Sequence, residues 1–308
     1  MNSAIVLAAE GDRKPVTIGF RLARQFIERS EARFTRFAES SELMQLNRSS
    51  GTWFQASPDL YEVVQVARSL GVETGGLFDP AILPALRQAG YDRSMDELLQ
   101  SGPLDTHRGP QPKMYDFRMI QLDPASRSIY LPAGMQIDLG GIAKGWIAEK
   151  AALQLARFST ACAVSAGGDM FLIDLPAGQS TWEVGLEDPL DPTRDLELLH
   201  IGPGAIATSS VAKRRWVVDG QPQHHLIDPR TGRPAETDWL SVTVLAPHAW
   251  QAEGFAKALL IGGSQVTGFG IKNENLKAFL AVDRYGKLWG SENSSEVFHV
   301  ACQNFFAG

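Results

Sequence analysis

The sequence predicts an α+β protein built on antiparallel or mixed sheets with flanking helices. Apolar residues recur at helical spacing in the amino-terminal part of the chain, whereas short alternating or apolar runs between turn residues follow Tyr115. Helices first and many strands later favour an α+β arrangement. A chain of 308 residues can bury a large core, and we expect one domain over residues 1–308. The polar segment 92–114, rich in Pro and Gly, is predicted to be a surface excursion of that domain.

The helices are predicted from apolar periodicity and from capping residues. Ser57 followed by Pro58 gives the clearest start, because Ser is a favoured N-cap and Pro is tolerated at the first helical position. Helices are expected over 21–37, from the Ser-Ser-Glu-Leu turn at 40–43 to about 47, and over 57–71, 82–89, 142–159 and 249–261.

The strands are predicted from short β-branched or alternating runs between turn residues. Hairpins are expected where two such runs flank a tight turn, as at Asp219-Gly220 and Tyr285-Gly286. The expected strands are 119–122 with 128–131, a strand reaching Asp138, then 163–165, 170–173, 182–186, 196–201, 204–208, 216–218 with 224–227, 241–245, and 279–283 with 287–289.

Composition excludes several classes of protein. The formal charge of −6 argues against a nucleic-acid-binding surface. Cys162 and Cys302 lie far apart without a CxxC motif, so neither a zinc site nor a disulfide framework is indicated. No apolar run approaches the length of a membrane span, and the amino-terminal residues lack the features of a signal peptide. We therefore expect a cytoplasmic protein as the chain stands, or an exported one if a signal has been trimmed.

The most informative segment is Ile137-Asp138-Leu139-Gly140-Gly141-Ile142-Ala143-Lys144-Gly145. It is interpreted as a strand that turns through paired glycines into a helix. Glycines at such a turn let backbone N–H groups approach a ligand, and a helix N-terminus favours an anion. Lys144 adds a cation in the first helical turn, where the helix dipole disfavours one, which suggests a bound phosphate. A tight turn with a solvated lysine is the alternative.

Three further segments carry polar groups that suit a ligand site. Ala166-Gly167-Gly168-Asp169 follows a buried strand, although a simple β-turn is the commoner explanation of such a motif. Thr208-Ser209-Ser210 offers hydroxyl groups at a strand end. In the segment 224–234, Asp228 follows His225 by three residues and could orient it. A histidine with a pKa of about 6.5 can act as a general base at neutral pH, whereas a turn capped by Asp228 is the alternative.

Seven short motifs occur along the chain in a fixed order: Ser-Ser-Glu-Leu (40–43), Gly-Gly-Leu-Phe-Asp-Pro (75–80), Asp-Leu-Gly-Gly-Ile-Ala-Lys-Gly (138–145), Ala-Gly-Gly-Asp (166–169), Ala-Thr-Ser (207–209), His-His-Leu-Ile-Asp-Pro-Arg-Thr-Gly-Arg-Pro (224–234) and Ser-Val-Thr-Val-Leu-Ala-Pro (241–247). Together they resemble the FAD:protein FMN transferases, the ApbE family once called thiamine biosynthesis lipoproteins. The resemblance covers about residues 33–263 and implies an ApbE-like α+β fold.

The resemblance implies a transferase that splits FAD. FMN would be attached through its phosphate to a Thr or Ser hydroxyl of a protein acceptor, and AMP would leave. By similarity, Asp138 and Lys144 bind FAD, and the loop of Phe78 and Asp79 helps to line the flavin site.

Three more residues acquire expected roles from the same resemblance. Phe37 stands where the family places an aromatic ring against the cofactor, and Ile227 would contact the cofactor through its backbone. His225 matches the histidine that deprotonates the acceptor hydroxyl.

The chain departs from the family at the expected metal site. Family members bind Mg²⁺ through a backbone carbonyl, here Gly141, and through an Asp and a Thr four residues apart on the last helix, where this chain has Glu253 and Lys257. Residues four apart share one helical face, so Glu253 and Lys257 would otherwise form an ordinary surface ion pair. Mg²⁺ prefers oxygen ligands in near-octahedral geometry, so Lys257 could replace the metal. Alternatively, Lys257 swings into solvent and Glu253 holds Mg²⁺ through water.

Two rival functions remain open at this point. A chain that has lost its metal site could bind FAD without transferring FMN. A chain that admits water in place of the acceptor hydroxyl would instead be an FAD pyrophosphatase, releasing FMN and AMP.

Overall fold

The computed structural model describes residues 4–100, 112–218, 220–267 and 274–300. Two compact units make up the chain, and each is assembled from separate segments of the sequence. Unit 1 contains residues 30–143 and 213–236, and unit 2 contains residues 3–29, 144–212 and 237–308. Organisation as one domain over residues 1–308 stays a prediction.

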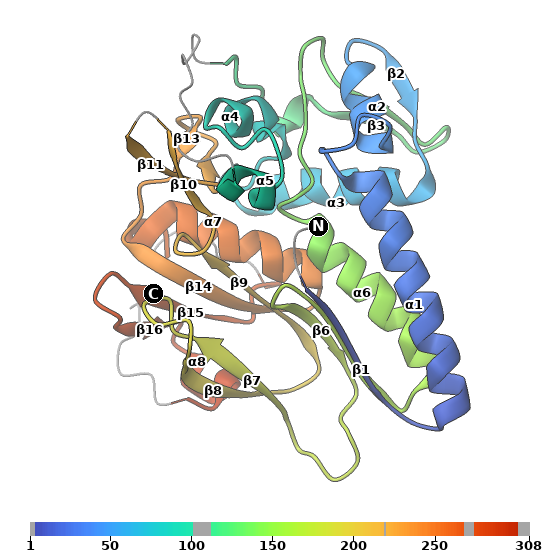
Figure 1. The fold of residues 1–308 in the computed structure, drawn as a ribbon, viewed down its shortest axis with the longest axis vertical. Coiled ribbons are helices and arrows are strands. Elements are labelled where there is room, and N and C mark those ends of the chain that lie inside the picture. Colours follow the sequence, from blue (N-terminus) through green and yellow to red (C-terminus); the bar gives the residue numbers. More distant parts are fainter. Residues whose placement is uncertain (1–3, 101–111, 219, 268–273, 301–308) are drawn as a thin grey trace. The chain divides into compact units, whose positions relative to one another are not determined.

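A seven-stranded sheet forms the centre of unit 2, and its strand order is β1-β5-β6-β9-β14-β15-β16 (Figure 1). Every neighbouring pair in this sheet is antiparallel, which confirms the expected α+β class. The strands are β1 Ile5–Glu10, β5 Ala161–Ala166, β6 Asp169–Ile173, β9 Gly204–Ser210, β14 Trp239–Ala246, β15 Ala278–Asp283 and β16 Leu288–Gly290.

The two faces of this sheet are covered differently. Helix α7, Ala249–Thr267, packs along β9 and β14 on one face. The opposite face carries the hairpin of β7, Trp182–Glu187, and β8, Asp195–Ile201, together with α8, Ser294–Phe298. Both faces of the central strands are therefore covered, and β14 is buried along nearly its whole length.

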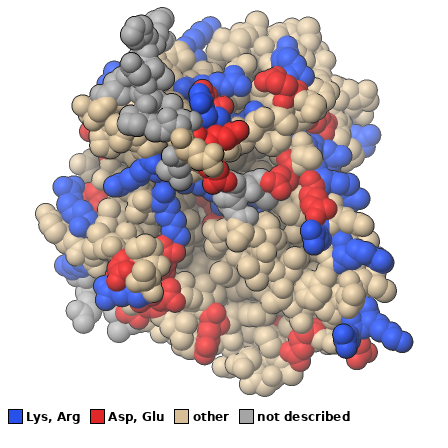
Figure 2. Space-filling model, in the orientation of Figure 1, with Lys and Arg blue, Asp and Glu red and all other residues tan. Residues whose placement is uncertain are grey.

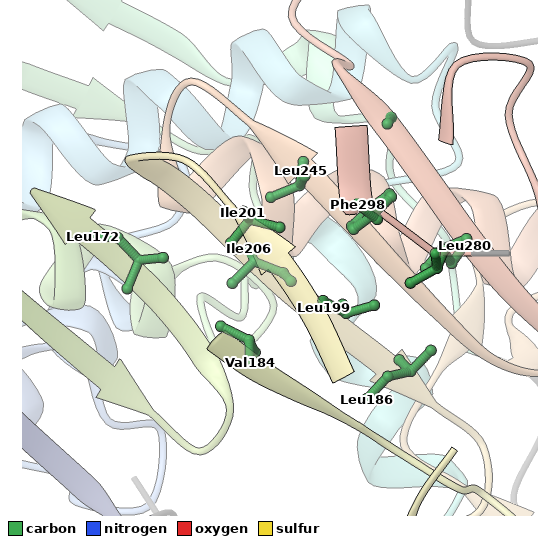
Figure 3. Close-up of a cluster of buried hydrophobic side chains, with 11 residues drawn as sticks. Leu172, Val184, Leu186, Leu199, Ile201, Ile206, Leu245, Leu280 and Phe298 are labelled. Atoms are coloured by element: carbon green, nitrogen blue, oxygen red, sulfur yellow. The ribbon is translucent and has the colours of Figure 1, made fainter. Parts of the chain in front are cut away.

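A hydrophobic cluster joins the hairpin and α8 to the sheet (Figure 3). Because side chains alternate across a strand, Ile206 and Leu245 face this cluster, whereas Ala207 and Val244 point to the opposite face. The buried members of the cluster are Leu172, Val184, Leu186, Leu199, Ile201, Ile206, Leu245, Ala278, Leu280, Phe298 and Val300.

Two more helices belong to unit 2. Helix α1, Arg13–Phe34, continues into unit 1, and α6, Ala143–Leu155, is followed by the 3₁₀ turn Ala156–Phe158. The rings of Phe26 and Trp146 lie 5.9 Å apart and join α1 to α6. The expected helix 142–159 is confirmed, whereas α1 begins eight residues before the expected position 21.

Unit 1 contains short helices and small sheets. Ser57 accepts the backbone N–H of Leu60, so the expected N-cap is confirmed, and Ser41 of the Ser-Ser-Glu-Leu turn caps α2 by accepting the N–H of Met44. The elements are α2 Glu42–Arg48, α3 Pro58–Glu73, α4 Leu83–Gln88, α5 Met95–Gln100, the 3₁₀ turns Pro80–Ile82 and Phe117–Met119, the three-stranded sheet of β2 Trp53–Gln55, β4 Ser128–Tyr130 and β3 Gln121–Asp123, and the hairpins of β10 Arg215–Val218 with β11 Gln221–His224 and of β12 Ile227–Asp228 with β13 Arg233–Pro234.

The strand expected to reach Asp138 was wrong. Ile137 and Asp138 belong to no strand; instead, the side-chain amide of Asn47 donates to the Ile137 carbonyl at 2.9 Å and accepts the Ile137 N–H at 2.8 Å. The Asp138 N–H donates to the carbonyl of Pro80 at 2.8 Å. A buried side-chain amide thus satisfies the backbone as a neighbouring strand would, and this pairing is not visible in the local sequence.

Part of the expected surface excursion is buried. Residues 101–111 lie outside the described residues. Within the described part, Met95 and Leu98 of α5 are 8% and 3% exposed and pack in a cluster with Tyr91 and Trp216. This segment therefore contributes to the core of unit 1.

Basic and acidic side chains are interspersed over the face drawn in Figure 2. Among the described residues, none of the helices combines the length and apolar character needed to cross a bilayer. Cys162 is buried in β5, and Cys302 lies outside the described residues.

Candidate active site

Four charged side chains meet in the interior of unit 2, and we call them the charged cluster. They are Lys144 on α6, Asp169 at the start of β6, and Glu253 and Lys257 on α7. Asp169 and Glu253 are 2% and 1% exposed, and both lysine side chains are 13% exposed. Two ammonium groups and two carboxylates thus balance in charge while almost fully removed from water.

The contacts within the charged cluster are short. Lys144 Nζ forms an ion pair with Asp169 Oδ2 and lies 3.4 Å from Glu253 Oε1. Lys257 Nζ lies 2.9 Å from the same Glu253 oxygen. The other Glu253 oxygen accepts the backbone N–H of Gly145 at 2.8 Å. The Glu253 carboxylate therefore joins α7 to α6 through the Lys144 ammonium group and the Gly145 N–H, and it also holds Lys257 of its own helix.

Local sequence explains how these side chains converge. Gly167 and Gly168 have positive φ values of 65° and 95° and form the turn between β5 and β6, so Asp169 begins the second strand of a hairpin. The β-turn alternative for this motif is confirmed. Gly145 allows α6 and α7 to pack closely, because a Cβ there would overlap the Ala249 carbonyl at the start of α7.

Burial and charge act against each other on these groups. Burial raises the pKa of Asp169 above its ordinary value. Burial also acts to raise the pKa of Glu253. The Lys144 and Lys257 ammonium groups and the Gly145 N–H outweigh burial, so the pKa of Glu253 is lowered. The pKa of Lys257 is lowered by burial, which outweighs its attraction to Glu253.

These residues do not fit a Mg²⁺ ion. A metal at Glu253 needs a carboxylate oxygen with a free lone pair and neutral oxygens beside it. Here Oε1 faces two ammonium groups and Oε2 accepts the Gly145 N–H. Across the described residues, no group of three or more His, Cys, Asp and Glu side chains is arranged to hold a metal ion. Gly141, the expected carbonyl ligand, lies in unit 1 in the turn that precedes α6.

A second group of expected site residues surrounds Arg36 in unit 1. The Arg36 guanidinium lies 4.3 Å from the ring centroids of both Phe37 and Tyr91. Its Nη1 donates to the Tyr91 carbonyl at 2.5 Å, and its Nε lies 3.3 Å from Asp138 Oδ1. Phe37 is 45% exposed, as an aromatic ring that stacks on a ligand would need to be. Arg36 therefore links two residues expected at the FAD site, Phe37 and Asp138.

Asp138 also shapes the glycine turn. Its Oδ2 accepts the N–H of Gly140 at 3.0 Å, while Oδ1 faces Arg36. The carboxylate side chain is 10% exposed. Asp138 therefore holds the backbone at the entry to α6, in the manner of a short Asx turn.

The Phe78-Asp79 loop is held within unit 1 by burial and by hydrogen bonds. Phe78 is buried, and its N–H donates to the hydroxyl of Thr74 at 3.0 Å. Asp79 caps the 3₁₀ turn that follows by accepting the N–H of Ala81 at 2.7 Å, and it accepts the N–H of Phe117 at 3.2 Å. Burial raises the pKa of Asp79 to about 6, although these two N–H groups oppose the rise.

The two adjacent histidines have different surroundings. His224 Nε2 lies 3.0 Å from the Ala235 carbonyl, and its Nδ1 accepts the Leu226 N–H at 3.3 Å. Both ring nitrogens are thus used by the backbone, and burial lowers the pKa of His224. His225 follows the end of β11 and is half-buried. The geometry leaves His225 as the better candidate base of the two.

Asp228 closes a turn. Its carboxylate accepts three hydrogen bonds from the Arg230 guanidinium at 2.7–3.1 Å, and its carbonyl accepts the Gly232 N–H at 2.8 Å. These contacts favour the turn interpretation of this motif. Ile227 is 1% exposed and packs in the same cluster as Trp216.

Sequence reasoning missed two charged residues. Asp169 was noted only as the end of a glycine turn, and Arg36 lies in the Phe-Thr-Arg-Phe segment from which only Phe37 was selected. Each is nine-tenths or more buried. The signal for Asp169 was its position directly after two glycines, but its partner is 25 residues away in the chain.

Comparison with known proteins agrees with this arrangement of motifs. The model of the ApbE family matches residues 3–280. A protein of Treponema pallidum named FAD:protein FMN transferase is 31% identical over 245 residues, which are 73% of this chain and 66% of the relative. One of Salmonella typhimurium with the same name is 27% identical over 253 residues, covering 79% of this chain and 71% of the relative.

Solved structures share the fold. The ApbE protein from Thermotoga maritima has a TM-score of 0.79 and 25% sequence identity, covering 96% of this chain and 94% of that one. The flavin transferase ApbE from Vibrio cholerae has the same TM-score at 22% identity and covers 96% of each chain, a likeness that concerns the fold. Because the family model spans most of the sequence, this chain belongs to the ApbE family.

Proposed function

We propose that this chain is an FAD:protein FMN transferase. The observation that carries the proposal is the match to the ApbE family over residues 3–280, together with relatives named for this activity. The enzyme is a transferase that uses FAD as substrate and a protein as acceptor. Simple FAD binding and FAD hydrolysis are not favoured by these relatives.

The reaction joins a protein hydroxyl to the FMN phosphate. The oxygen of a Thr or Ser on the acceptor attacks the FMN phosphorus of FAD, and the bond from that phosphorus to the bridging oxygen of the pyrophosphate breaks. AMP leaves with the bridging oxygen, and the hydroxyl proton passes to a base. Such a reaction depends mainly on positioning and on stabilising negative charge.

We propose these roles for the residues of unit 1. His225 is the base, since both nitrogens of His224 are engaged by the backbone. Phe37 offers an exposed ring for the cofactor, and Asp138 is held in place by Arg36. Phe78 and Asp79 form a rigid loop, and Ile227 contributes its backbone.

Lys144 of unit 2 is proposed to stabilise the phosphate groups. It lies in the first turn of α6, where backbone N–H groups also favour an anion. The Thr or Ser nature of the acceptor residue and the cytoplasmic location stay predictions.

The experiment uses the proteins of the source organism as acceptors. The purified chain is incubated with FAD and a cell extract, and the mixture is denatured and separated on a gel. Flavin fluorescence on a protein band together with AMP release supports transfer. Equal amounts of free FMN and AMP without a fluorescent band would indicate a pyrophosphatase, and unchanged FAD would indicate binding only.

A further inference from the structure

The charged cluster occupies the position where the resemblance places a metal, and its donor set is unsuited to one. We propose that Lys144 and Lys257, held by Glu253 and Asp169, take over the task of a divalent cation, so that this chain acts on FAD without Mg²⁺. The inference rests on the proposed function, because it assigns the groups that bind the pyrophosphate in that reaction.

The Glu253 carboxylate is unsuited to bind a metal ion. Glu253 is 1% exposed, and both its oxygens are engaged. Oε1 lies 2.9 Å from Lys257 Nζ and 3.4 Å from Lys144 Nζ, and Oε2 accepts the N–H of Gly145. A metal ion bound to Glu253 would have to displace an ammonium group or break the hydrogen bond from the Gly145 N–H. Mg²⁺ dehydrates reluctantly and requires near-octahedral oxygen ligands, so the exchange is unfavourable.

The charges of the charged cluster are balanced. The two carboxylates alone would attract Mg²⁺, but the two ammonium groups cancel their charge. Charges this close interact strongly when they are removed from water, so the cancellation removes the main attraction for a cation. The arrangement leaves positive groups on the partly exposed side chains and negative groups in the interior, which suits an anionic ligand.

The Lys257 ammonium group keeps a donor for a ligand. Lys257 donates to the side chain and the carbonyl of Glu253, both in its own helix, at 2.9 and 3.4 Å. An ammonium group has three N–H donors, so these two bonds leave one donor for an incoming oxygen. The side chains of Lys144 and Lys257 are 13% exposed, against 2% for Asp169 and 1% for Glu253, so the lysines form the outer part of the charged cluster.

The alternative in which Lys257 extends into solvent is not the arrangement that the structure adopts. A lysine that reaches solvent exposes its ammonium group. Here the Lys257 side chain is 13% exposed and bonded to Glu253. Metal binding by the chain therefore distinguishes the two arrangements of Lys257 without an acceptor.

The first test measures metal binding without FAD. Mn²⁺ serves as a paramagnetic probe for the Mg²⁺ site, and its free concentration is followed by electron paramagnetic resonance during titration with the protein. We expect the parent chain to leave the Mn²⁺ signal unchanged. The double variant Glu253→Asp with Lys257→Thr restores an all-oxygen set and is expected to bind Mn²⁺. Lys14→Thr, which removes one ammonium group from an exposed position on α1, is the matched control and is expected to bind none.

The second test measures FMN transfer in EDTA and in Mg²⁺. We expect equal rates for the parent chain and metal dependence for the double variant. Stoichiometric Mn²⁺ binding by the parent, or loss of its activity in EDTA with rescue by Mg²⁺, would overturn the inference and leave the proposed function intact. If the parent binds no Mn²⁺ and transfers no FMN under any condition, the proposed function fails instead. The parent measurements decide the matter even if the double variant does not fold.

Discussion

Lys257 Nζ lies 2.9 Å from Oε1 of Glu253, one helical turn earlier on α7, and both side chains are almost fully buried. An i,i+4 pair of this kind on a surface contributes about 0.3–0.5 kcal/mol. In the interior the pair contributes differently, because each charge must offset the desolvation cost of the other. The spacing of four residues predicts that Glu253 and Lys257 share a helical face, but it does not predict that this face is buried.

Removal of Lys144 should destabilise the protein. Lys144→Ala leaves the buried carboxylate of Asp169 without its ion-pair partner, and breaking a buried pair costs about 3–5 kcal/mol. We expect a fall in the free energy of unfolding of that order, measured by urea denaturation. The double variant Lys144→Ala with Asp169→Ala should recover part of the loss. Equal stability of Lys144→Ala and of the exposed-site control Lys14→Ala would contradict the pairing.

Asp79 should make stability depend on pH in an unusual direction. Burial raises the pKa of Asp79 to about 6 in the folded protein, above its ordinary value of 3.8. A group whose pKa is higher in the folded state binds a proton more tightly there, so its contribution is favourable below pH 4 and is lost as the pH rises through 6.

The variant Asp79→Asn removes this titration. Between pH 4 and pH 7 the parent should lose about 1–3 kcal/mol of unfolding free energy relative to the variant, since one pKa unit corresponds to about 1.4 kcal/mol. Urea denaturation at several pH values provides the measurement. A difference that is constant with pH would show that Asp79 has an ordinary pKa.

Arg36 is predicted to position Phe37 and Asp138 for FAD. Its guanidinium stacks against Phe37 and Tyr91, and its Nη2 is buried with no hydrogen-bond partner in the described parts of the chain. Arg36→Lys keeps the charge but loses the planar stack, so the affinity for FAD should fall by about 1–2 kcal/mol, seen as a higher KM with little change in kcat. Arg24→Lys, at a side chain 77% exposed, is the matched control. Unchanged FAD affinity in Arg36→Lys would refute the role.

Variants of the two histidines should have different effects, on catalysis for His225 and on stability for His224. His225→Ala is expected to slow FMN transfer by about 10²–10⁴-fold, the usual contribution of a general base, while flavin fluorescence titration shows unchanged FAD binding. His224→Ala removes the groups that bind the Ala235 carbonyl and the Leu226 N–H, so it should lower stability by about 1–3 kcal/mol. If His225→Ala transfers FMN at the parent rate, the base lies elsewhere.

Much of the fold follows from local sequence because capping and alternation act over a few residues. The caps at Ser41 and Ser57 and the strands around Leu245 are of this kind. The edge strand β1 was missed because its exposure alternates and its partner β5 lies more than 150 residues away. The segment at Ile137 was misassigned because its backbone partner is the side chain of Asn47, 90 residues earlier.

The candidate site shows the same limit. Single residues such as Lys144 and Glu253 could be selected from motifs, but their encounter with Asp169 depends on the packing of α6, α7 and the sheet. Arg36 could not be selected, because nothing in Phe-Thr-Arg-Phe shows that the arginine is buried between two rings. Sequence patterns indicate which groups are present, and tertiary contacts decide which of them are paired.

The most direct test of FMN transfer by this chain is mass spectrometry of the flavin-fluorescent protein formed from FAD and the cell extract. The account predicts a peptide whose mass is increased by FMN less one water, with the modification on a Thr or Ser, and AMP released in equal amount. The His225→Ala reaction, run in parallel, should yield almost none of this peptide. Free FMN and AMP without any modified peptide, or FAD recovered intact, would contradict the account.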